Sequence, residues 1–252
     1  MIGAHLSISF VVLGFAAFFA GAMNALAGGG SFITLPALMF TGMDARAANI
    51  TSTVALFPGQ ITSGLSGRAL VQGVGGLPFW ALMSVSLAGG VVGALLLLAT
   101  PPHFFAQLIP WLVLFATSVF AWGSFFRKPG HVAHKLPPRM AAVVQFFIAI
   151  YGGYFGGGIG FLMLATLTLA GVALRNAGAM KNALAGTMNA SAVLVFLFAP
   201  EVAWVQAGIV AVTSTVGGLA GTWLLKRVNE KLLRGFVVVV GIALTIGMFL
   251  RA

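Results

Sequence analysis

Two short glycine clusters are the part of the sequence best suited to bind a charged group. Gly28-Gly29-Gly30 is followed by Ser31, and Gly156-Gly157-Gly158 is followed by Ile159 and Gly160. A helix that begins inside a membrane leaves its first amides unpaired and carries about half a positive charge at that end. Because glycines have no side chain, an oxyanion can approach the backbone there. We therefore expect an anion site at both clusters, with tight helix packing as the alternative.

Polar side chains flank both clusters and could donate hydrogen bonds to the same anion. Amide and hydroxyl groups do this without the cost of burying a carboxylate, although in helical bundles they also bond one helix to another. The candidates are Asn24, Ser31, Thr34, Asn49, Thr51, Ser52, Thr53, Gln60, Lys181, Asn182, Thr187, Asn189 and Ser191. From glycines and polar residues together, the predicted substrate-binding set is Asn24, Gly29, Gly30, Ser31, Asn49, Thr53, Gly158, Gly160, Lys181, Asn182 and Asn189.

Lys181 is the cation most suited to attract such an anion. It stands two residues inside an apolar stretch. Ionisable residues within membrane segments generally mark functional sites, whereas a lysine close to the end of a segment can also extend its ammonium group to the water. Both interpretations stay open from the sequence.

Acids, bases and metal ligands are sparse in the apolar stretches. The three carboxylates, Asp44, Glu201 and Glu230, are expected in loops, and the histidines, His5, His103, His131 and His134, lie outside the apolar stretches. Enzymes and proton-coupled carriers need such groups inside the fold, so we expect no catalytic residues, no metal site and no cofactor. The pair His131 and His134 is assigned to a solvated linker rather than to a metal.

The composition indicates that lipid is the main solvent of this chain. Of the 252 residues, 60% are hydrophobic and only 6% are charged, against roughly 25% in soluble domains. The net charge of +10 is spread over short loops instead of one face, which argues against nucleic acid as a partner. The absence of cysteine excludes disulfides and thiolate sites. The expected partners are the lipid bilayer and a small anionic substrate, and the choice between a monomer and a homodimer stays open.

Ten apolar stretches predict an all-α polytopic membrane protein. Most are close to the ~20 residues that cross a bilayer as a helix, and the two that follow the glycine clusters are shorter. We expect each cluster to break a helix near the middle of the membrane. The first stretch resembles a signal peptide but has no preceding Lys or Arg, so we expect it to be retained. The stretches are 6–27, 31–43, 47–65, 77–99, 104–126, 140–157, 159–174, 179–198, 203–225 and 232–250.

The chain repeats itself at an offset of about 129 residues. At a shift of 129, Gly28, Gly29, Phe32, Leu38, Gly42 and Arg46 match Gly157, Gly158, Phe161, Leu167, Gly171 and Arg175. At a shift of 128, Gly89, Gly90, Gly93 and Leu97 match Gly217, Gly218, Gly221 and Leu225. These matches predict a first transmembrane repeat at 1–126, a cytoplasmic linker at 127–139 and a second repeat at 140–252.

The distribution of Lys and Arg sets the expected orientation. Cytoplasmic loops are enriched in these residues. Placing the linker inside leaves only Arg46 and Arg251 outside, with both termini on the periplasmic or extracellular side of the inner membrane. Because each repeat has five stretches, the two repeats then cross the membrane in opposite senses. Such inverted repeats commonly bind substrate at their interface.

The order of several segments resembles the TauE/SafE sulfite exporter family. These are Gly28 to Leu38, Asn49 to Gly59 with its Pro58-Gly59 end, Met180 to Leu184, and the glycine pairs at Gly89 and Gly217. One departure is Ala165, which stands where the first half has Pro36. The resemblance implies an inner-membrane permease that exports sulfite, organosulfonates or related anions by alternating access. An anion channel, or a membrane scaffold or subunit without its own transport activity, is the alternative.

Overall fold

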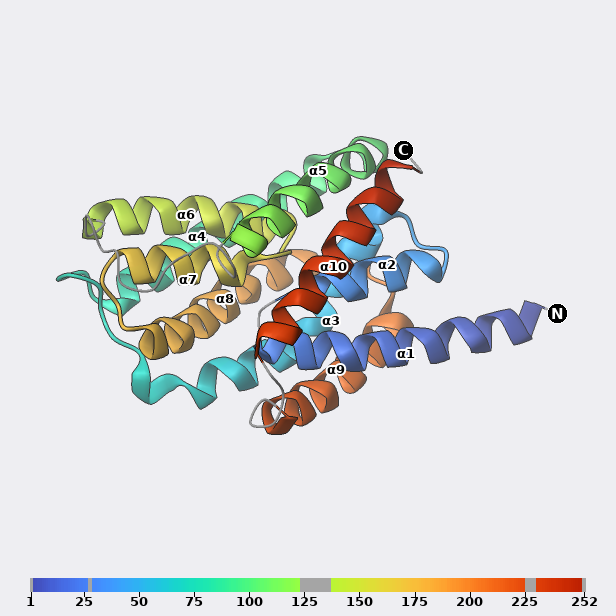
Figure 1. The fold of residues 1–252 in the computed structure, drawn as a ribbon. Helices are drawn as coiled ribbons and strands as arrows, with labels where there is room; N and C mark the ends of the chain where they lie inside the picture. The colour runs from blue at the N-terminus through green and yellow to red at the C-terminus, as the bar shows by residue number, and fades with distance from the viewer. Residues whose placement is uncertain (1, 27–28, 123–136, 225–229, 251–252) are drawn as a thin grey trace.

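The computed structural model describes residues 2–26, 29–122, 137–224 and 230–250, and this part of the chain consists of helices joined by short connections (Figure 1). The short 3-10 helix η1 (Arg68–Leu70) follows the third α-helix. The α-helices are α1 (Ile2–Leu26), α2 (Ser31–Phe40), α3 (Ala45–Ser66), α4 (Phe79–Ala99), α5 (Pro102–Ala121), α6 (Pro138–Tyr154), α7 (Ile159–Leu169), α8 (Leu174–Phe196), α9 (Trp204–Leu224) and α10 (Glu230–Phe249).

Local chemistry explains several of the helix boundaries. The Asp44 side chain caps α3 by accepting hydrogen bonds from the backbone amides of Arg46 and Ala47. Both α5 and α6 begin with a proline, Pro102 and Pro138, at a position where the missing amide hydrogen costs nothing. The apolar stretches are thus delimited by ordinary helix signals.

One sequence expectation about these boundaries is wrong: Glu230, expected in a loop, is the first residue of α10. His5 and His103, which stand outside the apolar stretches, lie within α1 and in the first turn of α5. Each of these helices begins a few residues before its apolar stretch. His131, His134 and most of the linker lie outside the described residues.

The surface of the bundle is apolar, as a lipid-facing surface must be. Large side chains such as Phe15, Phe147, Val212 and Leu219 are exposed on the outside of the helices. In the described part of the chain, Phe79–Ala99 and Pro102–Val119 are long and apolar enough to cross a membrane; Ile8–Asn24, Ser31–Phe40 and Trp204–Ala220 are shorter apolar segments.

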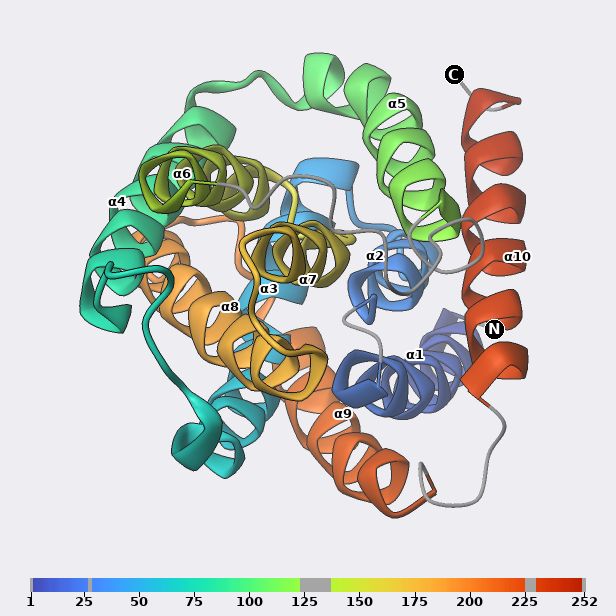
Figure 2. The same ribbon diagram turned by 60° about the vertical axis from the view of Figure 1, so that its left-hand side comes forward.

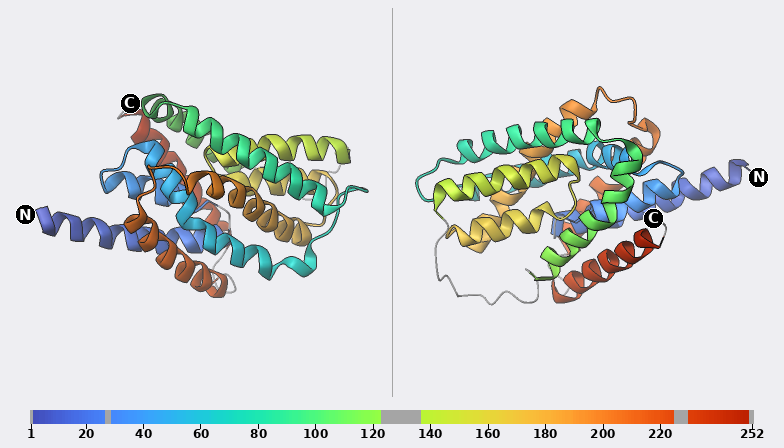
Figure 3. Two further views of the ribbon diagram at one scale, coloured as in Figure 1. Left: turned by 180° about the vertical axis from the view of Figure 1, so that it is seen from behind. Right: turned by 90° about the horizontal axis from the view of Figure 1, so that it is seen from above.

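The helices pack so that two short ones occupy the middle of the bundle. α1 packs along α9, and α4 packs along α6. α2 and α7 lie in the middle when the bundle is viewed nearly end-on (Figure 2), and they extend from its centre towards opposite ends (Figure 1). α10 lies obliquely against α5 at one side (Figure 3).

The bundle has two ends, the Arg46 end and the Arg175 end. At the Arg46 end, α3 and α9 begin and α4 ends; at the Arg175 end, α3 stops and α6 and α8 begin (Figure 1). The first turn of α1 and the last turn of α10 both lie towards the Arg46 end.

Candidate functional site

A narrow polar cavity lies where the two helix junctions meet the middle of α3 and α8. Its volume is about 30 Å³. A cavity of this size holds about one or two water molecules, so an anion of several atoms needs some side chains to move. The lining residues are Asn24, Ser31, Thr53, Leu56, Gln60, Ser63, Gly156, Ile159, Gly160, Lys181, Asn182, Ala185 and Asn189.

The two junctions use glycine for different reasons. Between α6 and α7, Gly156 and Gly158 have φ of +77° and +75°, a left-handed conformation that side chains disfavour. Between α1 and α2, Gly30 has an ordinary helical φ of −56°, but a Cβ there would lie 2.7 Å from the carbonyl oxygen of Ala20. Glycine is therefore required by conformation at one junction and by close approach at the other.

α2 and α7 begin at the wall of the cavity. Ser31, the first residue of α2, and Ile159 and Gly160, the first two of α7, all line it. Among the described residues, no side chain caps the first amides of either helix. Two helix N-termini, each with a partial positive charge, therefore border the same polar space.

α3 and α8 contribute the polar side chains of the opposite wall. Asn189 donates from Nδ2 to Oε1 of Gln60, which leaves the Gln60 amide hydrogens unused by this bond. The Oδ1 of Asn189 is buried without a partner in the described chain. The Thr53 hydroxyl donates to the carbonyl of Asn49, 3.0 Å away, so its own proton does not face a ligand.

Lys181 is the only cation among the lining residues, and it is buried, with 7% of its surface exposed. Within the described residues, neither Lys181 nor its neighbour Asn182 has a hydrogen-bond or ion-pair partner. No carboxylate is among the described residues that line the cavity. An unpaired buried cation is costly, so this arrangement favours an anion as the missing partner.

The structure brings together seven of the eleven predicted site residues. They are Asn24, Ser31, Thr53, Gly160, Lys181, Asn182 and Asn189. Gly29, Gly30, Asn49 and Gly158 are buried outside the cavity lining. Asn49 donates from Nδ2 to the carbonyl of Tyr154 at 3.0 Å, and a Cβ on Gly158 would lie 2.8 Å from that of Ala116.

The other polar candidates serve as structural hydrogen-bond partners. Thr34 and Ser52 bond to each other at 2.6 Å, and Thr51 accepts from the amide of Ala203 at 3.2 Å. Thr187 and Ser191 donate to carbonyls of their own helix. These residues are of the same types as those that line the cavity, so it is the packing of the helices that decides whether such a side chain lines the cavity or bonds to the fold.

The predicted site set omitted five lining residues besides Gln60: Leu56, Ser63, Gly156, Ile159 and Ala185. For Leu56, Ser63 and Ala185, helical spacing was the signal that could have identified them. Thr53, Leu56, Gln60 and Ser63 fall three or four residues apart on one face of α3, and Asn182, Ala185 and Asn189 do so on α8. Extending the polar positions along that face would have found the apolar ones.

Comparison with known proteins identifies the family. Residues 13–248 match the family described as sulfite exporter TauE/SafE. A probable membrane transporter protein of Haemophilus influenzae is 28% identical over 98% of this chain and 96% of its own length. A probable membrane transporter protein, ORF9, of a Sinorhizobium species is 31% identical, covering 92% and 88%.

A third relative gives the same result, and no solved structure matches the chain. The probable membrane transporter protein YfcA of Escherichia coli K12 is 28% identical over 91% of this chain and 85% of its own length. The family match covers nearly the whole described fold, including both junctions, α3 and α8. The chain therefore belongs to the sulfite exporter TauE/SafE family of membrane transporters.

Proposed function

We propose that this chain is a secondary transporter that exports small anions, sulfite or organosulfonates, by alternating access at the interface of two inverted repeats. The observation that carries the proposal is the cavity that holds Lys181 without a counterion in the described chain. Asn182 and Gln60 offer amide donors beside it, and the N-termini of α2 and α7 add their partial charges. All of these groups favour a negative ligand.

Two carboxylates, those of Asp44 and Glu201, are engaged away from the cavity, and none is among the described residues that line it, which supports an anion over a cation. The Asp44 side chain caps α3, and the Glu201 side chain is paired with Arg46. The charge of Lys181 is therefore not cancelled within the site. A sulfonate or sulfite group, with three oxygens on one sulfur, offers acceptors for several of these donors at once.

Several features support the inverted repeats. α5 begins and ends 128 residues before α10, and Gln60 bonds to Asn189, its counterpart at an offset of 129. The same offset relates other lining residues: Ser31 with Gly160, Thr53 with Asn182, and Leu56 with Ala185. We assign the first repeat to 1–126, the linker to 127–139 and the second repeat to 140–252, with the helix breaks near the membrane midplane.

The charged ends support an inner-membrane orientation with both termini outside. Arg68 and Arg175 are exposed towards the Arg175 end, together with Arg139 at the start of α6. Arg46, at the other end, is paired with Glu201. We therefore assign the Arg175 end to the cytoplasm.

Membrane potential is a sufficient driving force in this scheme. An inside-negative potential of ~100 mV favours expulsion of each negative charge by about 2.3 kcal/mol. Sulfite efflux from proteoliposomes should therefore accelerate when an inside-negative potential is imposed. Efflux that is indifferent to the potential would exclude this form of coupling.

The test of the site is sulfite binding to the purified protein with Lys181→Ala, compared with Lys181→Arg as the control that keeps the charge. Removing a cation that bonds to the ligand should weaken affinity roughly tenfold or more, and more for dianions than for monoanions. Isothermal titration calorimetry measures both. Equal affinity in Lys181→Ala and the native protein would overturn the assignment of Lys181.

The alternatives give different results in the same preparation. A carrier shows saturable counterflow, in which external sulfite accelerates the exit of labelled internal sulfite, whereas an anion channel does not. A scaffold or subunit without its own activity should show no thermal stabilisation by sulfite or by sulfonates.

A further inference from the structure

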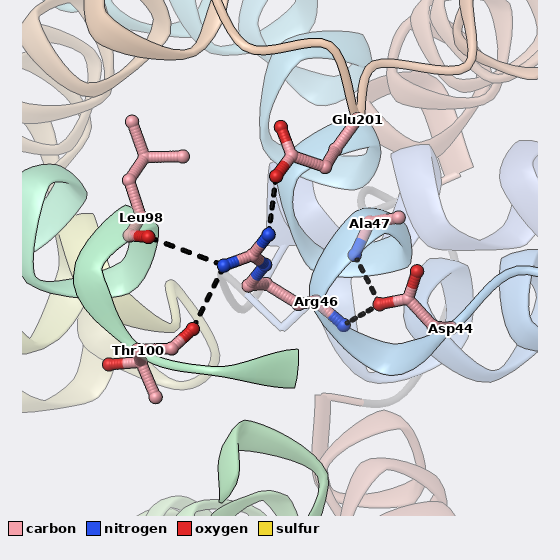
Figure 4. A network of polar contacts seen from close by, with 6 residues as sticks. All are labelled: Asp44, Arg46, Ala47, Leu98, Thr100 and Glu201. Carbon is pink, nitrogen blue, oxygen red and sulfur yellow. Dashed lines mark hydrogen bonds and ion pairs between the residues drawn. The ribbon is translucent and has the colours of Figure 1, made fainter. Parts of the chain in front are cut away.

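Arg46 joins three separate segments at its end of the bundle (Figure 4). Its Nη1 donates to the carbonyls of Leu98 and Thr100 at 3.3 and 2.9 Å, and its Nη2 donates to Oε1 of Glu201. Leu98 and Thr100 are at the end of α4, and Glu201 lies between α8 and α9. One guanidinium therefore holds α3, the end of α4 and the α8–α9 loop together.

Two further contacts extend this network towards the helix junctions. The amide of Ala203, next to Glu201 in the same loop, donates to Thr51 of α3 at 3.2 Å. The Tyr154 hydroxyl donates to Oγ1 of Thr100 at 3.3 Å, and Asn49 donates to the Tyr154 carbonyl at 3.0 Å. Because Tyr154 ends α6, the network reaches from the Arg46 end to the α6–α7 junction beside the cavity.

The part of α3 between this network and the cavity is fully buried. Residues 47–52 of α3 are all buried, and Thr53 is the first residue of α3 to line the cavity. Beyond it, none of residues 57–65 is buried. α3 is thus buried on the Arg46 side of the cavity and partly exposed on the Arg175 side.

The corresponding position at the other end has no such network. Arg175 occupies the second position of α8, as Arg46 does in α3, but it is exposed and has no bonded partner in the described chain. The two arginines occupy the same position in their helices, but in the described chain only Arg46 bonds neighbouring segments together.

We propose that Arg46 and Glu201 form a latch that closes the cavity at the Arg46 end and must separate for the cavity to open there. This inference rests on the proposed function, because it takes the cavity as the transport site. The pair is suited to reversible opening: its side chains are 15% and 22% exposed, and Arg46 Nε and Glu201 Oε2 are buried without partners in the described chain. Water would satisfy both atoms when the latch opens, which offsets part of the cost of breaking it.

The absence of cysteine makes a direct accessibility test possible. A Thr53→Cys reporter at the closed edge of the cavity is labelled with a membrane-impermeant maleimide, in vesicles of each orientation. Adding Glu201→Gln should speed labelling from the Arg46 side roughly tenfold, the effect expected for loss of one charge-assisted hydrogen bond. Arg175→Ala, the matched control, should leave the labelling rate unchanged.

A second variant tests the latch independently, in case Glu201→Gln does not fold. Arg46→Lys keeps the charge but cannot bond to three acceptors with one planar group, so it should also speed labelling from that side. Monodisperse gel filtration of each variant is the check on folding. If neither Glu201→Gln nor Arg46→Lys changes the rate, or if Arg175→Ala raises it equally, the latch is overturned.

Failure of the latch and failure of the proposed function remain separate results. Maleimide labelling needs no substrate, so an unchanged rate would refute the latch alone. If the native protein neither bound nor transported sulfite, the proposed function would be refuted whatever the labelling rate.

Discussion

Gly89 of α4 and Gly217 of α9 make corresponding contacts in the two halves of the molecule. A Cβ on Gly217 would lie 1.9 Å from the carbonyl oxygen of Phe18 in α1. A Cβ on Gly89 would lie 2.8 Å from that of Phe146 in α6. Each contact joins a helix of the first half of the chain to a helix of the second half, and the two backbones touch at a glycine.

The halves differ where charge is involved. Lys181 lines the cavity, whereas Ser52, at the corresponding position of α3, is buried and bonded to Thr34 at 2.6 Å. The Arg46 side chain is bonded to three acceptors, the carbonyls of Leu98 and Thr100 and the carboxylate of Glu201, whereas Arg175 is exposed. The shared contacts hold the helices together, and the unshared charges give the two ends different properties.

The largest effect is expected from adding a methyl group at Gly217, where two helices touch. Gly217→Ala should destabilise the protein by about 1–3 kcal/mol or more, because the added methyl meets backbone that cannot turn aside. Thermal unfolding in detergent measures the change. Gly208→Ala in the same helix has no atom within 4 Å of the new Cβ, so it should be neutral or stabilising by up to ~1 kcal/mol. Equal melting temperatures for the two variants would contradict the proposed close contact.

A smaller effect, on sulfite affinity, should distinguish Asn182 from Thr53, its counterpart in the cavity lining. Asn182→Ala removes an amide that is unbonded in the described chain, and should weaken sulfite affinity by roughly tenfold. Thr53→Ala should change affinity by less than about twofold, because its hydroxyl proton is already donated to Asn49. Calorimetric titration of both variants decides the comparison, and a larger loss at Thr53 would reverse the assigned roles.

The smallest effect is expected at Ser52, the counterpart of Lys181. Ser52→Ala removes the buried bond to Thr34 and should lower the free energy of unfolding by about 1 kcal/mol. Sulfite affinity should stay unchanged, because Ser52 lies outside the cavity. A loss of affinity comparable with that in Lys181→Ala would show that the two positions are functionally equivalent.

The sequence alone was sufficient for the helices and for much of the cavity. Long apolar runs predict helices because a backbone in lipid must satisfy its own hydrogen bonds, and ten were expected and found in the described chain. The glycine clusters placed Ser31 and Gly160 at helix starts, and both line the cavity. Lys181 could be selected because a cation inside an apolar run is costly without a function.

Only the tertiary structure decided which polar residues face the cavity and which bond to neighbouring helices. Asn49 and Asn189 look alike in the sequence, yet one bonds to Tyr154 while the other bonds to Gln60 in the cavity wall. The same holds for the two arginines. The side-chain partners of Arg46 are more than 50 residues away along the chain, whereas Arg175 has no bonded partner in the described chain. Helix formation depends on neighbouring residues, whereas the partner of a polar side chain is set by segments that meet only when the whole chain has packed.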